Sequence, residues 1–178
     1  MALIRKHVAI IIIVIFFIAA MAVLFFIFRK TGSEKLSPVS LHVMPDLVFK
    51  NLDAQDITVS SLRGRPIVFH LWASWCVLCM REISDLVTLQ KEFGDHIVII
   101  EVNRRESSDI IKKYRDQLDA GHALLFVVDG NDSLYEAIKG FSMPETIFVD
   151  LNGEIRDHTR GPVGLIDIKR RIQDSFGL

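Results

Sequence analysis

Apolar and polar positions along the chain follow two periodicities, which predict short strands and amphipathic helices. Residues 67–72 form an apolar run of the kind found in a strand that is covered on both faces. In residues 76–93 the apolar positions Ile83, Leu86, Val87 and Phe93 recur at helical spacing, and Gly94 follows as a stop signal. This succession predicts a strand that leads directly into a long helix.

The same patterns predict the remaining elements. Further strands are expected at residues 47–52, 57–59, 97–102, 124–128, 145–150 and 154–158, and further helices at 60–63, 107–120, 132–138 and 165–176. Asn152-Gly153 is a strong turn signal, which makes the last two strands a hairpin. Strands that alternate with helices in this way predict an α/β domain with a central mixed sheet flanked by helices.

The amino-terminal segment has a different composition. Residues 8–28 contain no charged residue, glycine or proline, and a helix of this length is about 31 Å long, close to the roughly 30 Å of a bilayer's hydrocarbon core. We therefore expect an N-terminal transmembrane anchor in residues 1–30, a tether in 31–43 and one globular domain in 44–178. A cleaved signal peptide is the alternative, because Ala20-Met21-Ala22 has the small-x-small form, but the apolar run continues past it.

Charge restricts the partners of the globular part. Residues 31–178 contain all 22 Asp and Glu but 17 of the 21 Lys and Arg, which gives a net charge of about −5. This balance, without a basic block, argues against nucleic acid as a partner. Basic residues flank the apolar segment on both sides, so their distribution barely fixes its orientation. We expect the domain on the extracytoplasmic, periplasmic side of the membrane.

The only two cysteines, Cys76 and Cys79, stand at the start of the predicted long helix. If the helix begins at Cys76, the sulfur of this residue lies among unpaired N–H groups at the positive end of the helix dipole, where a thiolate is stabilised. Cys79 then lies one turn further along the same face and can attack or close on Cys76. A purely structural disulfide would close too short a loop to stabilise the fold much, and zinc would need two more ligands. The spacing therefore favours dithiol/disulfide redox chemistry.

Two segments carry a resemblance to a known family. Residues 69–82, Phe-His-Leu-Trp-Ala-Ser-Trp-Cys-Val-Leu-Cys-Met-Arg-Glu, resemble the active-site segment of membrane-anchored thioredoxin-like proteins, the group of the cytochrome c maturation thiol reductases and their TlpA-type relatives. Residues 140–150 resemble the proline loop of this group, and the likeness covers about residues 44–176. It implies a thioredoxin-like fold and a thiol:disulfide oxidoreductase without cofactor or metal, with protein disulfides as substrates and an upstream thiol as electron donor.

The resemblance also implies roles for single residues. Cys76 is implied to be the nucleophile that forms the mixed disulfide, and Cys79 to resolve it. Glu82, three residues after Cys79, is implied to assist proton transfer, whereas an exposed glutamate that interacts with the helix dipole is the alternative. His70 stands where thioredoxin itself has a buried acid, and it is either a proton relay or a hydrogen-bonded core residue.

Substrate contacts are expected at the proline loop and the tryptophans. The Met143–Pro144 bond is implied to be cis and to face the dithiol, so that the backbone of Met143 can pair with an extended client segment. An ordinary trans turn is the alternative. Trp72 and Trp75 are expected to form the wall beside the dithiol and part of the substrate contact.

The dipeptide between the cysteines leaves the direction of electron flow open. Val77-Leu78 contains neither the proline nor the glycine usual in such motifs, and it gives a thiolate no polar support. A reductase is the leading hypothesis, and an oxidase that introduces disulfides is the first alternative. The second is a non-enzymatic binding module that handles Cu(I) through Cys76, Cys79 and Met80.

Overall fold

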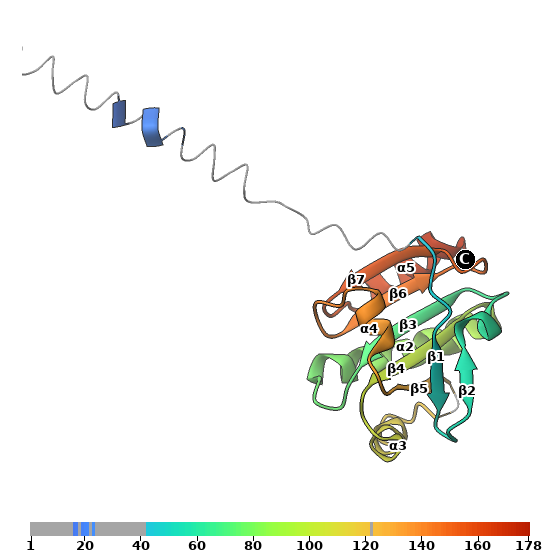
Figure 1. Cartoon of the computed structure of the whole chain (residues 1–178). Helices are drawn as coiled ribbons and strands as arrows, with labels where there is room; N and C mark the ends of the chain where they lie inside the picture. Colours follow the sequence, from blue (N-terminus) through green and yellow to red (C-terminus); the bar gives the residue numbers. More distant parts are fainter. Residues whose placement is uncertain (1–15, 18, 22, 24–41, 122) are drawn as a thin grey trace, which may run out of the picture. The chain divides into compact units, whose positions relative to one another are not determined.

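A computed structural model describes residues 16–17, 19–21, 23, 42–121 and 123–178 of the chain (Figure 1). The predicted anchor and tether lie almost entirely outside these residues. Within the described part of the chain, no helix is both long and apolar enough to cross a bilayer. The elements below all belong to the compact unit Val39–Leu178.

One seven-stranded sheet forms the centre of this unit. Its strands follow the order β2-β1-β5-β4-β3-β6-β7. The three middle strands β5, β4 and β3 are parallel, and all other neighbours pair antiparallel. The bounds are β1 (Val48–Asn51), β2 (Asp56–Thr58), β3 (Ile67–Trp72), β4 (Val98–Arg104), β5 (Leu125–Asp129), β6 (Glu145–Val149) and β7 (Ile155–Arg160). Strand β3 lies between β4 and β6 and is covered on both faces, and all six of its residues are buried.

Helices cover both faces of the sheet (Figure 1). The α-helices are α2 (Val77–Phe93), α3 (Ser108–Gln117), α4 (Ser133–Ala137) and α5 (Leu165–Phe176), with short 3-10 helices η1 (Val59–Leu62) and η2 (Gly94–His96). On one face, Val68 and Trp72 of β3 share a core with residues of α2, α3 and α5. On the other face, Phe69 and Leu71 pack with η1 and α4. The alternation of side chains along β3 thus supplies two separate cores.

The predicted mixed sheet flanked by helices is confirmed, and the boundaries differ by a few residues. The helix expected to run to about residue 120 ends at Gln117, because Asp119 takes a left-handed conformation with φ of 50° and turns the chain. The strand expected at 97–102 continues to Arg104, paired with Asp129 of β5. The predicted hairpin is present as β6 and β7, with Gly153 at a φ of 89° in the turn.

Both ends of α2 are fixed by the residues that the pattern indicated. Cys76 is the N-cap with an extended backbone, and the helix therefore begins at Val77. Gly94 ends it at a φ of 56°, a conformation that favours glycine, and donates its N–H to the carbonyl of Gln90. The buried residues Ile83, Leu86 and Leu89 lie on the face toward the sheet. Their packing fixes how α2, and therefore Cys76, sits above β3.

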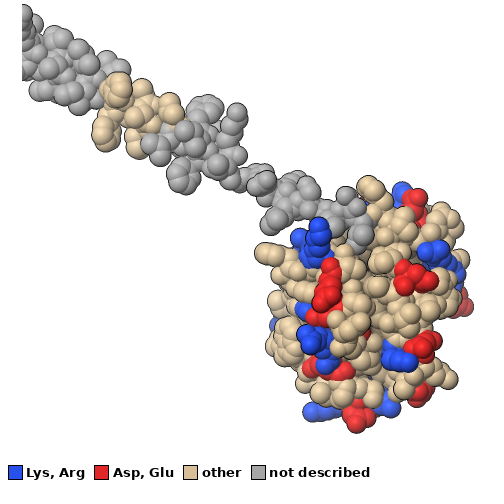
Figure 2. Space-filling model, viewed as in Figure 1, with Lys and Arg blue, Asp and Glu red and all other residues tan. Residues whose placement is uncertain are grey.

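Charged residues of both signs are interspersed on the face of the domain in Figure 2. Exposed ion pairs include Lys50 with Asp56 at 2.5 Å and Arg170 with Asp167 at 3.0 Å. Exposed pairs of this kind contribute little to stability. The stability of the fold therefore rests on the two cores.

Gly140 tests the packing of the segment that leads into the proline loop. A Cβ atom on this residue would lie 2.1 Å from Cδ2 of the Tyr135 ring, whose face also contacts Arg104. We expect Gly140→Ala to lower the free energy of unfolding by about 1–3 kcal/mol, because the ring must move. Gly130→Ala is the matched control, since no atom lies within 4 Å of its Cβ position. Urea unfolding of both variants measures the difference, and equal stability would contradict this packing.

Candidate active site

The two cysteines form a disulfide at the amino-terminal end of α2. The Cys76–Cys79 bond spans three positions of the chain, with 5.3 Å between the two Cα atoms. Cys76 is 7% exposed, and Cys79 is fully buried. Of the two cysteines, only Cys76 thus has any exposed surface at which a reacting thiol could approach.

The Cys76 sulfur caps the helix. It accepts a hydrogen bond from the backbone N–H of Cys79 at 3.2 Å. The first turn of α2 contains no acidic residue that would oppose a thiolate here. On reduction, the same N–H and the helix dipole stabilise negative charge on Cys76. The Cys79 sulfur lies 4.0 Å from the carbonyl oxygen of Leu71, in the core beneath.

A carboxylate that sequence reasoning missed holds the segment before Cys76. Glu106, just beyond β4, accepts the backbone N–H of Ser74 at 2.8 Å and its hydroxyl at 2.5 Å. Asn103 donates to the same carboxylate at 2.8 Å. These bonds fix the turn between β3 and α2 and thereby the position of Cys76. The sequence shows hydrogen-bonding side chains at Ser74 and Asn103, but it does not show that both bind Glu106.

Large apolar side chains are exposed beside the disulfide. Trp75, Val77 and Leu78 are 64%, 73% and 45% exposed, and Phe141 of the proline loop is 71% exposed. An apolar rim of this kind suits contact with an apolar segment of another polypeptide. Trp75 is exposed, as a substrate contact requires, and that role stays a prediction.

The prediction that Trp72 contacts substrate is wrong. Its side chain has no exposed surface and packs edge-on against Tyr114 and Phe126 at centroid distances of 6.3 and 6.0 Å. The reason is its register: Trp72 is still paired with Asn103 of β4, on the face that α2 covers. It forms part of the core behind Cys76 and Cys79.

The Met143–Pro144 bond is cis, which confirms that prediction. The loop before it is held by Glu145, whose carboxylate accepts the backbone N–H groups of Phe141 at 2.5 Å and Ser142 at 2.8 Å. His158 of β7 contacts the second carboxylate oxygen at 2.8 Å. Met143 is half-buried and packs against the core that contains both cysteines. Glu145 therefore anchors the loop on which the predicted substrate-binding residue lies.

Glu82 is buried, with 2% exposure, so the alternative of an exposed glutamate is excluded. Its carboxylate accepts the hydroxyl of Thr146 at 2.8 Å and the backbone N–H of Val163 at 3.2 Å. It also lines a surface pocket of about 200 Å³ together with Leu78, Arg81, Asp85, Pro162, Val163 and Gly164. Glu82 thus lies between the core beside Cys79 and an opening to the surface.

His70 is fully buried and is hydrogen-bonded, as the core-residue alternative required. Its Nδ1 atom lies 2.6 Å from Oε2 of Glu101, which is also fully buried. Sequence reasoning did not single out Glu101, although an acid within the apolar run 97–102 was a usable signal. The relay role of His70 stays a prediction.

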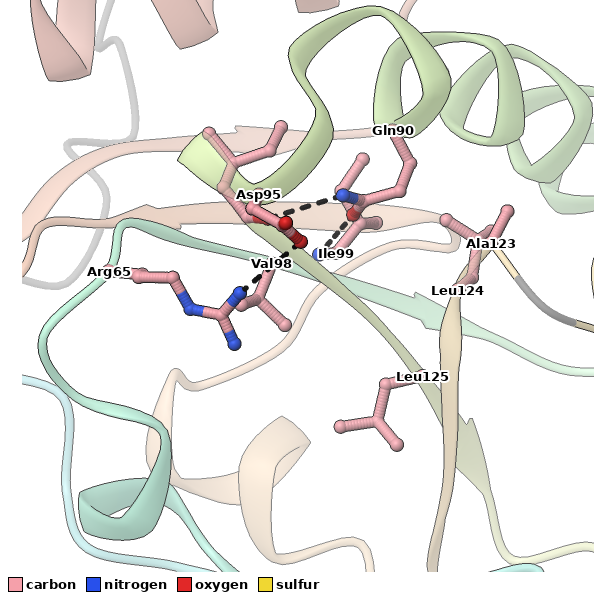
Figure 3. Close-up of a pocket in the computed structure, with 9 residues that line it drawn as sticks. Arg65, Gln90, Asp95, Val98, Ile99, Ala123, Leu124 and Leu125 are labelled. Carbon is pink, nitrogen blue, oxygen red and sulfur yellow. Dashed lines mark hydrogen bonds and ion pairs between the residues drawn. The ribbon is translucent and has the colours of Figure 1, made fainter.

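A pocket at the other end of the sheet takes no part in this site (Figure 3). It has a volume of about 300 Å³ and is lined by Val98 and Leu125, with Arg65 and Asp95 paired at 3.9 Å. These strand residues are the first of β4 and β5, whereas Cys76 follows the last residue of β3. Because the three strands are parallel, the pocket and the disulfide lie at opposite ends of the strands.

Comparison with known proteins identifies relatives of the whole domain. The Redoxin family model matches residues 41–169. The thiol-disulfide oxidoreductase ResA of Geobacillus kaustophilus is 25% identical over 150 residues, which are 83% of this chain and 84% of that protein. The thiol:disulfide interchange protein DsbE of Pseudomonas fluorescens is 32% identical over 112 residues, which are 62% of this chain and 58% of that protein.

Solved structures show the same fold. The exposed lipoprotein thioredoxin Etrx1 of Streptococcus pneumoniae superposes with a TM-score of 0.64 at 24% identity, over 73% of this chain and 99% of that chain. A thiol:disulfide interchange protein of Chlorobium tepidum superposes with a TM-score of 0.64 at 21% identity, over 75% and 94%. The predicted thioredoxin-like fold is therefore confirmed.

Glu145 gives a prediction for stability against pH. Burial raises the pKa of Glu145, but the bonds from His158, Phe141 and Ser142 outweigh it, and the pKa lies below the usual value of 4.5. A lowered pKa in the folded state stabilises the protein above the unfolded pKa, and this contribution disappears as pH falls through the folded value. We expect Glu145→Gln to cost about 2 kcal/mol at neutral pH and progressively less at acid pH.

Urea unfolding of the oxidised protein at several pH values measures this difference. Glu154→Gln is the matched control, because Glu154 lies exposed in the same hairpin and, within the described part of the chain, its side chain pairs only with Arg156. A loss of stability for Glu145→Gln that is the same at neutral and acid pH would refute the role of the carboxylate charge.

Proposed function

The chain belongs to the Redoxin family, and from this premise we propose that its Cys76–Cys79 pair reduces disulfide bonds of protein clients outside the cytoplasm. The chain is a thiol-disulfide oxidoreductase, as are the named relatives that match most of its length. Our proposal adds the direction of electron flow, the class of client and the place of action. The observation that carries it is the accessible Cys76 sulfur at the N-cap of α2, backed by the buried Cys79.

We propose Cys76 as the nucleophile and Cys79 as the resolving thiol. The thiolate of Cys76 attacks a client disulfide and forms a mixed disulfide, releasing one client thiol. Cys79, one turn further along α2, then attacks the Cys76 sulfur, releases the second client thiol and restores the disulfide present in the structure. An upstream dithiol returns two electrons to the pair, and no cofactor takes part.

The electrostatics of the site support a reductant. A dithiol oxidises its partners strongly when its reduced, thiolate form is much stabilised. Among the described residues, no Lys, Arg or His side chain hydrogen-bonds the Cys76 sulfur, whose one such bond comes from the N–H of Cys79. Glu82 lies buried one turn after Cys79, and Val77 and Leu78 bring no polar group. Beyond the N–H of Cys79 and the helix dipole, these residues add no stabilisation of the Cys76 thiolate, which favours the oxidised protein and hence electron donation.

We propose that clients bind across the apolar rim and the proline loop. An extended client segment would pair with the backbone of Met143 beside Pro144 and contact Trp75 with its apolar side chains. Apocytochrome c and copper-site assembly proteins are the clients that the resemblance of residues 69–82 suggests. The expected anchor in residues 1–30 and tether in 31–43 would hold the domain 44–178 at the periplasmic face of the inner membrane.

The reduction potential tests the direction of electron flow. We expect a midpoint potential below about −200 mV, the range of reductants, rather than near −120 mV, the range of enzymes that introduce disulfides. Equilibration of the isolated protein with glutathione buffers of defined ratio, read out by quantifying the free thiols, gives the value. A potential near that of the oxidising enzymes would overturn the proposed direction and favour the oxidase alternative.

Trapping in cells identifies the clients. In Cys79→Ser the resolving thiol is lost, so Cys76 should stay linked to clients in adducts that a reducing agent releases. The full chain is expressed, and adducts are separated on non-reducing gels and identified by mass spectrometry. We expect exported proteins among the clients.

Two variants serve as controls for the trapping. Cys76→Ser should form few adducts, and the Cys76→Ser/Cys79→Ser variant none. Adducts formed only by Cys76→Ser would reverse the assignment of nucleophile and resolving thiol. Clients confined to the cytoplasm would refute the extracytoplasmic placement. A double variant that retains partner binding and biological activity would support the binding module instead.

A further inference from the structure

Three ionisable side chains lie together in the core below the disulfide. His70 of β3 is paired in register with Glu101 of β4, and Glu82 of α2 covers them from above. Their exposed fractions are 0%, 0% and 2%. We call His70, Glu82 and Glu101 the buried triad. Buried ionisable groups of this kind are rare unless they are paired, and they cluster at functional sites.

Each of the two ring nitrogens of His70 lies near one of the two carboxylates. Nδ1 lies 2.6 Å from Oε2 of Glu101, and Nε2 lies 3.9 Å from Oε1 of Glu82. Within the described part of the chain, Nε2 of His70 and Oε1 of Glu101 have no hydrogen-bond partner. Partly satisfied buried polar groups destabilise a core relative to apolar side chains of similar volume. Stability therefore does not explain the triad.

Among the residues that the structure describes, no further charge faces His70. On β6 the residue opposite is Thr146, whose hydroxyl donates to Glu82. The preceding residue, Glu145, lies on the other face of the sheet and binds His158. Helix α5 contributes the apolar residues Ile168 and Ile172 to this core. The protonation of His70 is therefore governed by the two carboxylates of the triad.

The carboxylates of Glu101 and Glu82 favour a proton on the hydrogen-bonded pair of His70 and Glu101. Burial lowers the pKa of His70, but the charge and hydrogen bond of Glu101, and then the charge of Glu82, outweigh it, so that the pKa is raised. Burial raises the pKa of Glu101, and His70 offsets this only in part. Because the two groups titrate as a pair, both directions mean that the pair holds a proton to higher pH than free side chains would.

Glu82 connects this pair to the dithiol and to the surface. It lies three residues after Cys79, on the same side of α2. Leu71, which follows His70, has its carbonyl oxygen 4.0 Å from the Cys79 sulfur. Glu82 also lines the 200 Å³ pocket beside Val163. Glu82 thus lies between His70 Nε2, 3.9 Å from its Oε1 atom, and the pocket that opens to the surface, on the side of α2 that carries Cys79.

We propose that His70 and Glu101 are positioning residues that hold a proton for Glu82 to deliver to the Cys79 sulfur during reduction of the disulfide. A donor thiolate attacks Cys76, the Cys76–Cys79 bond breaks, and Cys79 leaves with the electron pair and takes the proton from Glu82. His70 Nε2 reprotonates Glu82. The second donor thiol loses its proton to water and attacks the donor sulfur of the mixed disulfide; the bond to Cys76 breaks, Cys76 leaves as a thiolate, and the donor becomes a disulfide. During client reduction the proton moves in reverse, from Cys79 to Glu82.

The proposal rests on the proposed redox function of Cys76 and Cys79, and the rate of reduction by dithiothreitol tests it. This reagent needs no client surface. After correction for its thiolate fraction, the rate of the natural protein should show a break with pH where the His70–Glu101 pair titrates. His70→Asn and Glu101→Gln should each lower the neutral rate by about tenfold, less than the loss of a direct general acid because Glu82 remains.

The pH profile separates proton supply from a structural role. Glu101→Gln should move the break to lower pH, because His70 loses its carboxylate, and Glu101→Asp should restore it toward the natural position. His96→Asn, an exposed histidine of η2, is the control that should leave rate and break unchanged. Variants that lower the rate equally at all pH values, with the break in place, would overturn the proposal.

A measurement on the natural protein guards against variants that fail to fold. We expect the His70 ring, followed by nuclear magnetic resonance, to titrate at a different pH in the oxidised and reduced states. Identical titration in both states would refute the coupling. A disulfide that dithiothreitol does not reduce at all would refute the redox function itself, whereas normal reduction with unchanged profiles in all variants would refute only the role of His70 and Glu101.

Discussion

The site depends on the rigidity of β3 and on the short distance from its end to α2. Hydrogen bonds to β4 and β6 hold β3 on both sides, so Trp72 at its end cannot shift without breaking the sheet. Four residues later Cys76 caps the start of α2, and the apolar face of this helix packs on the same side of the sheet as Trp72. Cys76 therefore has one available position, as the N-cap of α2. The chemistry of its sulfur follows from that position.

The features of this site that depend on local sequence were accessible from the sequence. Cys76 caps the start of helix α2 and Gly94 caps its end, and both signals are readable because a capping side chain and a glycine with positive φ act within a few residues. The hairpin at Gly153 and the order of strands and helices follow from similarly local signals. Trp72 was misplaced because its exposure depends on how far β3 stays paired with β4, which hydrophobic periodicity does not report.

The features that depend on register between distant strands were not accessible. Glu101 meets His70 because two parallel strands pair in one particular register, 31 positions apart in the chain. Glu106 likewise reaches Ser74 only after the end of β4 has been placed beside the turn that follows β3. A one-residue shift of β4 would turn Glu101 to the opposite face. Polar residues in buried strands thus need the sheet before their partners can be named.

The buried triad would affect both the charge on the Cys79 sulfur and the supply of a proton to it. Carboxylates below the disulfide oppose negative charge on Cys79, so the leaving sulfur must be protonated for the reduced state to form. The same carboxylates raise the proton affinity of His70 and so keep that proton within reach. A core of apolar residues would provide neither effect, since it would hold no proton and exert no field on the sulfur. In the proposed mechanism, the instability that three ionisable groups bring to the core would be offset by reactivity, because the triad would lower the reduction potential and hold a proton near the leaving sulfur.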